Sequence, residues 1–120
     1  MKAKQIVIVG YDDVMGLDLV GPLEAFGSAR VNTGPGKAEE AYRVTVAALG
    51  AKTFRSEFGL AFTTTEYLSE IQEADTLLVP GGRGMRRADN AQHWERARGR
   101  PAAVLPSATF KSQPSRAPAS

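Results

Sequence analysis

The alternation of apolar and polar residues predicts a strand followed by a helix at the start of the chain. A β-branched run at residues 5–9 ends at Gly10 and is typical of a buried strand. Apolar residues then recur between residues 19 and 26 with the spacing of one helix face. We expect Asp18 to be the N-cap of this helix, because an aspartate oxygen accepts hydrogen bonds from the first backbone N–H groups. Pro22 then falls near the end of the first turn, where a proline is tolerated.

The rest of the pattern completes an order of strand, helix, strand, helix and strand. This order predicts an α/β fold with a parallel sheet. The segments that carry the prediction are strands at 42–49 and 76–79, a loop at 31–40, a hairpin or two short strands at 53–55 and 60–64, and a helical turn at 67–73.

Beyond Gly84 the periodicity weakens. Residues 85–100 are compatible with a helix but show no clean apolar stripe, and residues 99–120 contain four prolines, four serines and five alanines. We therefore divide the chain into an α/β domain at 1–98 and a tail at 99–120 that is expected to be disordered. The sequence also allows a last short strand at 102–105.

Charge divides the chain in a similar way. Residues 1–82 hold 7 Lys and Arg against 11 Asp and Glu, a net charge of −4, whereas residues 83–120 hold 8 against 2, a net charge of +6. A basic tail on an acidic body suggests an anion-binding appendage or a segment foreign to the fold. Arg83, Arg86 and Arg87 form a basic cluster, for which solvated charge and anion recognition both stay open.

Composition narrows the chemistry. The hydrophobic and charged fractions, 42% and 23%, are those of a soluble globular protein. The sequence has no run of 18 apolar residues and no signal peptide. We therefore expect a cytoplasmic protein that does not enter membranes. The 120 residues contain no cysteine and a single histidine, His93. Disulfides, thiolate metal sites, cysteine nucleophiles and multi-histidine metal sites are therefore excluded.

In a parallel sheet, ligands bind beyond the carboxyl ends of the strands. Residues 10–18 follow the first strand and residues 80–85 follow the third, so the candidate site lies there. The first segment has no Gly-x-Gly-x-x-Gly turn and the second lacks the lysine of a P-loop, so we expect no nucleotide cofactor. We also expect no metal, because the sequence has no cysteine and a single histidine.

These two segments carry a family resemblance. Val9-Gly-Tyr-Asp-Asp-Val-Met-Gly-Leu-Asp-Leu-Val-Gly-Pro-Leu-Glu-Ala-Phe26 and Asp75-Thr-Leu-Leu-Val-Pro-Gly-Gly-Arg-Gly84 together resemble the ThiJ/PfpI superfamily of class I glutamine amidotransferase-like domains. Their sequence is most similar to the N-terminal domains of AraC-type transcriptional regulators and to isocyanide hydratases. The resemblance covers residues 5 to about 90, roughly the first half of such a domain, and implies a partial doubly wound (flavodoxin-like) sheet.

The resemblance also implies roles for matched residues. Asp18 takes the position of the acid that hydrogen-bonds the nucleophilic cysteine in hydratase-like members. Gly81, Gly82 and Arg83 take the position of the backbone N–H groups that line the pocket and stabilise an oxyanion. The family's cysteine lies on a later strand-to-helix elbow, and the nearest stretch here places Pro106 at that position. As written, the chain is therefore not expected to catalyse hydration or amide hydrolysis.

The resemblance implies a non-catalytic ligand-sensing domain, a fragment of an AraC-type regulator that lacks its DNA-binding module. The alternatives are a truncated isocyanide hydratase-like lyase without its cysteine, and a stand-alone interaction domain. The expected partners are a small-molecule ligand and further copies of the chain, with nucleic acid bound only through a separate C-terminal module. The break in pattern near residues 90–100 suggests a frameshift or a premature stop.

Overall fold

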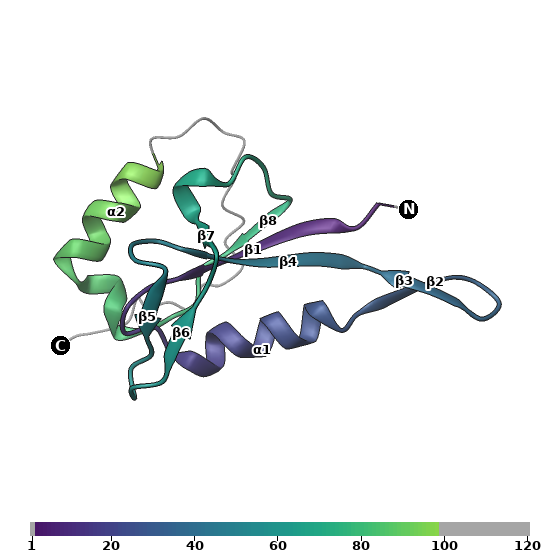
Figure 1. Ribbon diagram of the computed structural model, residues 1–120, viewed down its shortest axis with the longest axis horizontal. Helices are drawn as coiled ribbons and strands as arrows, with labels where there is room; N and C mark the ends of the chain where they lie inside the picture. Colours follow the sequence, from purple (N-terminus) through teal and green to yellow (C-terminus); the bar gives the residue numbers. More distant parts are fainter. Residues whose placement is uncertain (1, 99–120) are drawn as a thin grey trace.

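The computed structural model describes residues 2–98, and its centre is a four-stranded parallel sheet in the order β7-β4-β1-β8 (Figure 1). The parallel α/β fold predicted from the sequence is confirmed. The strands of this sheet are β1 (Lys4–Gly10), β4 (Tyr42–Ala48), β7 (Glu66–Tyr67) and β8 (Thr76–Leu78).

Strand β1 is central because its side chains are apolar on both faces. Ile6, Val7, Ile8 and Val9 are all at most 3% exposed. The backbone of Ile6 pairs with Val44 of β4 on one side and with Thr76 of β8 on the other. A strand covered on both faces reads as a continuous apolar run, which is how residues 5–9 appear in the sequence.

Helix α1 (Gly16–Gly27) covers one face of the sheet, and the aromatic ring of Phe26 packs edge-on against Tyr42 of β4. The predicted N-cap is wrong. The cap is Met15, whose carbonyl accepts from the backbone N–H groups of Asp18 and Leu19, and no side chain caps the helix. Strand-like bridges hold Val14 immediately before Met15, so the helix begins there, and Asp18 lies inside the first turn.

The predicted loop at 31–40 is also wrong. Strands β2 (Arg30–Gly34) and β3 (Lys37–Glu40) form an antiparallel hairpin that projects away from the sheet (Figure 1). Its turn contains Pro35, and Gly36 has a φ of +69°, which favours glycine. The Asn-Thr-Gly-Pro-Gly segment thus supplies the turn and part of the first strand of a solvent-exposed hairpin.

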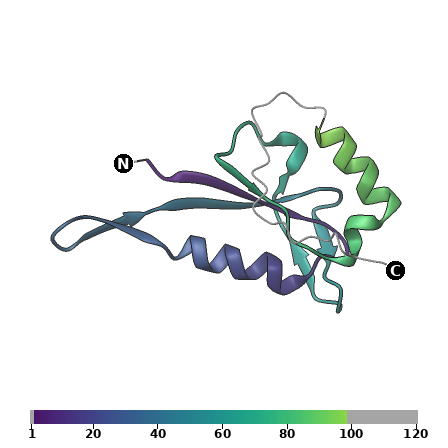
Figure 2. The same ribbon diagram turned by 180° about the vertical axis from the view of Figure 1, so that it is seen from behind.

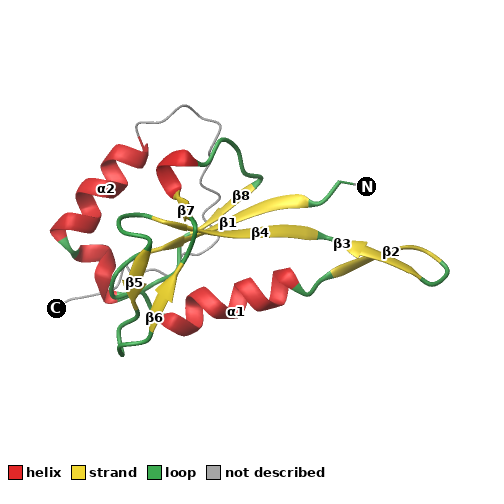
Figure 3. Cartoon of the chain, in the orientation of Figure 1, coloured by secondary structure: helices red, strands yellow, loops and turns green. Residues whose placement is uncertain are grey.

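Two smaller predictions are confirmed. Strands β5 (Thr53–Arg55) and β6 (Ala61–Thr63) form an antiparallel hairpin, and a single helical turn, η1 (Leu68–Glu70), follows β7 (Figure 3). The rings of Phe54 and Phe62 pack at 5.6 Å, and Phe54 is buried beneath Gly10 at the end of β1. This contact holds the hairpin against the carboxyl end of the sheet.

After β8 the chain forms a short turn, η2 (Arg83–Arg86), and helix α2 (Ala88–Arg98), on the opposite side of the sheet from α1 (Figures 1 and 2). Trp94 of α2 packs against the core. The predicted strand at 102–105 and the predicted disordered tail lie outside the described residues. Within residues 2–98, no helix is long and apolar enough to cross a membrane.

Candidate functional site

The candidate site is a cluster of loops at the carboxyl ends of β1 and β8. Val14, in the loop after β1, forms a parallel bridge with Ser56 and an antiparallel bridge with Gly82. The backbone N–H of Met15 donates to the Gly81 carbonyl at 2.9 Å, and the N–H of Glu57 donates to the Val14 carbonyl at 2.9 Å. Three segments that are distant in the sequence are thereby fixed together.

Gly82 can only be glycine in this arrangement. Its φ is +156°, and a Cβ there would lie 2.6 Å from both the Asp13 carbonyl oxygen and the Met15 nitrogen. These are backbone atoms of a hydrogen-bonded loop, so they cannot move aside as a flexible side chain would. The close approach of the two loops therefore depends on this position.

In the structure, Asp18 and Gly81 lie next to one another. Asp18 is half-buried in the first turn of α1, and its Oδ2 lies 3.3 Å from the point where a Cβ on Gly81 would stand. The carboxylate thus rests against the turn that follows β8. Its position near the helix N-terminus favours the negative charge. The acid and oxyanion roles themselves remain predictions.

Arg83 also lies at the site, but its backbone N–H is occupied. It donates to Oε2 of Glu57 at 2.8 Å, and the Arg83 guanidinium donates to the Glu57 carbonyl at 3.2 Å. The Glu57 side chain is 9% exposed. The amide assigned to an oxyanion therefore already binds a carboxylate of the same chain, in a charge-assisted hydrogen bond.

Glu57 was missed by the sequence reasoning. It lies in the turn between β5 and β6, and its only local signal is its place after a short strand. Its partner Arg83 is 26 residues away in the sequence, so no local pattern indicates this contact and only the fold creates it.

Tyr11 lies beneath the two carboxylates. It is 1% exposed, and its hydroxyl donates to the carbonyl of Pro80. Burial raises the pKa of the Tyr11 phenol well above its usual value, and the negative charges of Glu57 and Asp18 raise it further. The phenol therefore stays protonated.

The predicted basic cluster is mostly paired with acids. Arg87 binds Asp13 and Asp89 at 3.2 Å each, and Arg83 forms the pair with Glu57. The Arg87 guanidinium lowers the pKa of the Asp89 carboxyl. Within the described residues, no group of three or more metal-binding side chains is close enough to hold an ion.

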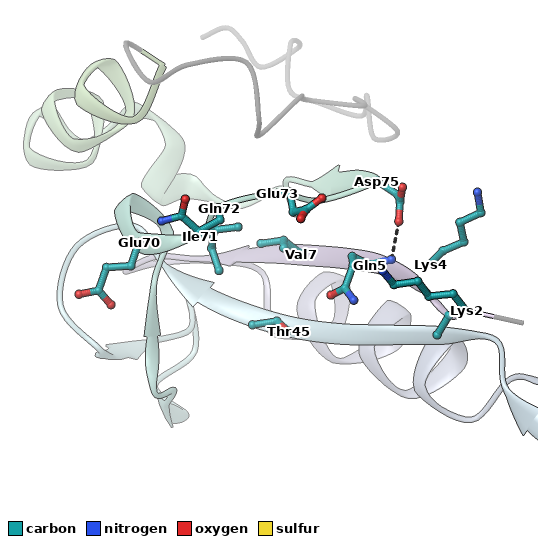
Figure 4. Close-up of a pocket in the computed structure, with 11 residues that line it drawn as sticks. Lys2, Lys4, Gln5, Val7, Thr45, Glu70, Ile71, Gln72, Glu73 and Asp75 are labelled. Carbon is teal, nitrogen blue, oxygen red and sulfur yellow. Dashed lines mark hydrogen bonds between the residues drawn. The ribbon is translucent and has the colours of Figure 1, made fainter.

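A groove of about 510 Å³ lies at the other end of the sheet from the loop cluster (Figure 4). Its charged side chains are exposed, and Asp75 accepts a hydrogen bond from the backbone N–H of Gln5 at 2.7 Å. This groove lies near the amino ends of β1 and β8. Because ligands of parallel sheets bind at the carboxyl ends, we assign the candidate site to the loop cluster.

The loop cluster offers two carboxylates, a protonated phenol and fixed backbone groups, in a sequence that has no cysteine. Such a site can accept hydrogen bonds from a ligand and orient it. The Glu57 carboxylate is held by a hydrogen bond from Arg83 and the Tyr11 phenol stays protonated, so both are weak nucleophiles.

Sheet order, a helix on each face and a loop cluster at the strand ends define a parallel α/β domain of the doubly wound, flavodoxin-like class. The chain has the fold shared by ThiJ/PfpI and DJ-1 superfamily proteins. It is similar to a ThiJ/PfpI family protein from Pseudomonas syringae, with a TM-score of 0.59, 22% identity, and coverage of 87% of this chain and 41% of that one.

Two further solved structures give the same result. Drosophila melanogaster DJ-1beta has a TM-score of 0.60 at 14% identity and covers 81% of this chain and 50% of its own. A ThiJ/PfpI family protein from Bacillus anthracis has a TM-score of 0.59 at 18% identity, covering 80% and 45%. The chain thus spans about half the length of these proteins or less, and identities this low show the fold alone. No family model matches the sequence, and no curated protein matches it.

Proposed function

We propose that this chain is a non-catalytic ligand-binding domain of the ThiJ/PfpI type, corresponding to part of the ligand-sensing domain of an AraC-type regulator. The observation that carries the proposal is the Asp18 carboxylate against the Gly81 turn in a sequence without cysteine. Asp18 takes the position of the family's acid, and the 120 residues contain no cysteine for it to assist. Binding without turnover is the function that fits both facts.

The contact between Glu57 and Arg83 supports binding over catalysis. An oxyanion formed in a reaction needs an open N–H donor, and the Arg83 N–H is already bonded to a buried carboxylate. A ligand that brings its own hydrogen-bond donors, in contrast, meets acceptors at Asp18 and Glu57. The proposed ligand is therefore a small molecule with donor groups.

The test uses the 120-residue chain and two probes: N-methylformamide, which carries an N–H donor, tests binding, and an aliphatic isocyanide tests turnover. We expect saturable changes in the backbone amide resonances of Gly81 and Gly82, and no formamide product above the rate in buffer. Asp18→Asn should weaken the binding, because it replaces one acceptor oxygen with a donor. Glu24→Gln is the matched control, since Glu24 is an exposed carboxylate on the same helix.

Formamide production by the chain would overturn the non-catalytic assignment. Unchanged amide resonances, or equal effects of Asp18→Asn and Glu24→Gln, would remove the site from the proposal.

The second candidate is an isocyanide hydratase-like lyase whose cysteine elbow is encoded further along the gene. The position of Asp18 favours it, because that acid serves the nucleophile in hydratase-like members of the family. Sequencing the gene from the codon of Gly82 onward in all three frames separates the two. An elbow containing cysteine with little after it supports the lyase, whereas about a hundred further residues with two helix-turn-helix patterns support the regulator.

A further inference from the structure

A cavity of about 100 Å³ lies between α2 and the ends of three parallel strands, on the face of the sheet opposite α1. Most of its wall is apolar. The lining residues are Val9, Tyr11, Leu49, Val79, Met85, Asn90, Ala91, Trp94 and Glu95. An engineered apolar cavity of about 150 Å³ admits benzene, so this one has room for about four or five non-hydrogen atoms.

Asn90 gives the cavity a specific polar group. The residue is 5% exposed, and its Nδ2 donates to the Gly84 carbonyl at 2.9 Å and to the Asp12 carbonyl at 3.3 Å. These two bonds fix the orientation of the amide. Among the side chains and backbone groups that the structure describes, none donates a hydrogen bond to its Oδ1. A buried acceptor without a donor is costly, so this oxygen favours a ligand that supplies one.

The other polar groups favour a neutral ligand. The Tyr11 hydroxyl is engaged with Pro80 and stays protonated, so it adds no charge to the wall. Glu95 is exposed and therefore lies at the solvent side of the cavity. A charged ligand would be buried among Val9, Leu49 and Val79, with the exposed Glu95 as the only charged residue of the lining, which disfavours it.

We propose that this cavity binds a small neutral molecule with an apolar body and one hydroxyl or amide donor directed at Asn90 Oδ1, of the size of a short branched alcohol. The ligand lies in the interior behind the strand-end loops. The proposal is independent of the proposed function, because neither Asp18 nor Glu57 lines the cavity, although Tyr11 and Met85 belong to both regions.

The experiment titrates the full chain with 2-methylpropan-1-ol and with 1-chloro-2-methylpropane, which has a similar size but no donor. Trp94, the only tryptophan in the sequence, reports occupancy by fluorescence, and the Asn90 side-chain amide reports it by NMR. We expect saturable responses of both reporters to the alcohol. The chloro compound should bind about tenfold more weakly, the cost of leaving the acceptor unpaired.

The variant Val79→Phe fills part of the cavity from the residue that follows β8 and should weaken alcohol binding by about tenfold or more. Val31→Phe, on the projecting hairpin, is the matched control and should leave binding unchanged. If Val79→Phe does not fold, the comparison of the two ligands decides alone. Absence of a saturable response to the alcohol, or equal affinity for the two ligands, would overturn the proposal, whatever the result at Asp18.

Discussion

At the scale of single residues, Gly82 controls how closely the loops after β1 and β8 approach. We predict that Gly82→Ala lowers the free energy of unfolding by at least about 2 kcal/mol, because the new Cβ would meet backbone atoms at 2.6 Å and the positive φ disfavours a side chain. Urea denaturation measures the change. Gly27→Ala is the control, since no atom lies within 4 Å of a Cβ there, and similar losses for the two variants would contradict the argument.

Tyr11 should make the stability of the protein depend on alkaline pH. Its folded pKa is raised above the unfolded value of about 10, so the stability it contributes is complete below pH 10 and decreases as the pH rises further. We predict that the parent loses up to about 1.4 kcal/mol per pH unit more than Tyr11→Phe does above pH 10. Urea midpoints between pH 9 and 11.5 measure this difference.

Tyr11→Phe also loses the hydrogen bond to Pro80, so its stability at pH 8 should be lower by about 1 kcal/mol. Tyr42→Phe is the control for general effects of removing a tyrosine hydroxyl. Parallel curves for the parent and Tyr11→Phe would show that the phenol does not contribute to the alkaline transition.

The residues of the site were predictable only where a strand end marked them. Asp18 and Gly81 follow strongly apolar strands, so the rule for parallel sheets placed them at one edge before the fold was known. Tyr11 also follows a strand end, but the sequence does not show that it is buried, and Glu57 follows only a short strand. Glu57 reaches the site because the β5–β6 hairpin folds back onto Val14, and the burial of Tyr11 depends on the packing of η2 and α2, neither of which has a sequence signature.

At the scale of elements, the buried strands were predictable and the exposed hairpin was not. Strand β1 is apolar throughout and covered on both faces, and β4 is buried at its end, at Ala47 and Ala48, so both leave an apolar pattern. Strands β2 and β3 are almost entirely exposed, so no apolar alternation is needed for them to form. The glycines and the proline of that segment predict a turn correctly, but they do not show that strands flank it.

Helix α1 contains Pro22 as its seventh residue, because the helix begins at Gly16 and not at the predicted cap. A proline there removes the hydrogen bond to the carbonyl of Asp18, a residue of the candidate site. We predict that Pro22→Ala raises the free energy of unfolding by about 1–2 kcal/mol.

Gly21→Ala is the matched control in the same helix, because it improves helix propensity by about 1 kcal/mol without restoring a hydrogen bond. Thermal and urea denaturation of the two variants give the comparison. A stabilisation by Pro22→Ala no larger than that of Gly21→Ala would show that the helix already accommodates the proline.

At the scale of the whole molecule, the sheet combines a well-covered centre with short edges. Strand β1 is paired on both sides, whereas β8 pairs with β1 at three positions and is the last strand of the sheet within residues 2–98. Its side chains Leu77 and Leu78 are nevertheless buried, as in the interior of a larger sheet. An apolar edge strand with unpaired backbone groups favours pairing with another chain.

We therefore predict that the chain self-associates through β8, and that a charge on this edge opposes the association. Thr76→Lys places an ammonium group on the strand, as natural edge strands do, and leaves the backbone bonds to β1 intact. Thr65→Lys is the control, because it makes the same change at an exposed position between β6 and β7.

Sedimentation velocity at about 100 μM measures the association. The parent and Thr65→Lys should contain dimers or larger species. Thr76→Lys should be mainly monomeric, because desolvating the lysine at a strand interface is unfavourable. A monomeric parent would show that β8 is protected within its own chain, and equal association of all three proteins would place the contact elsewhere, with the projecting β2–β3 hairpin as the next surface to test.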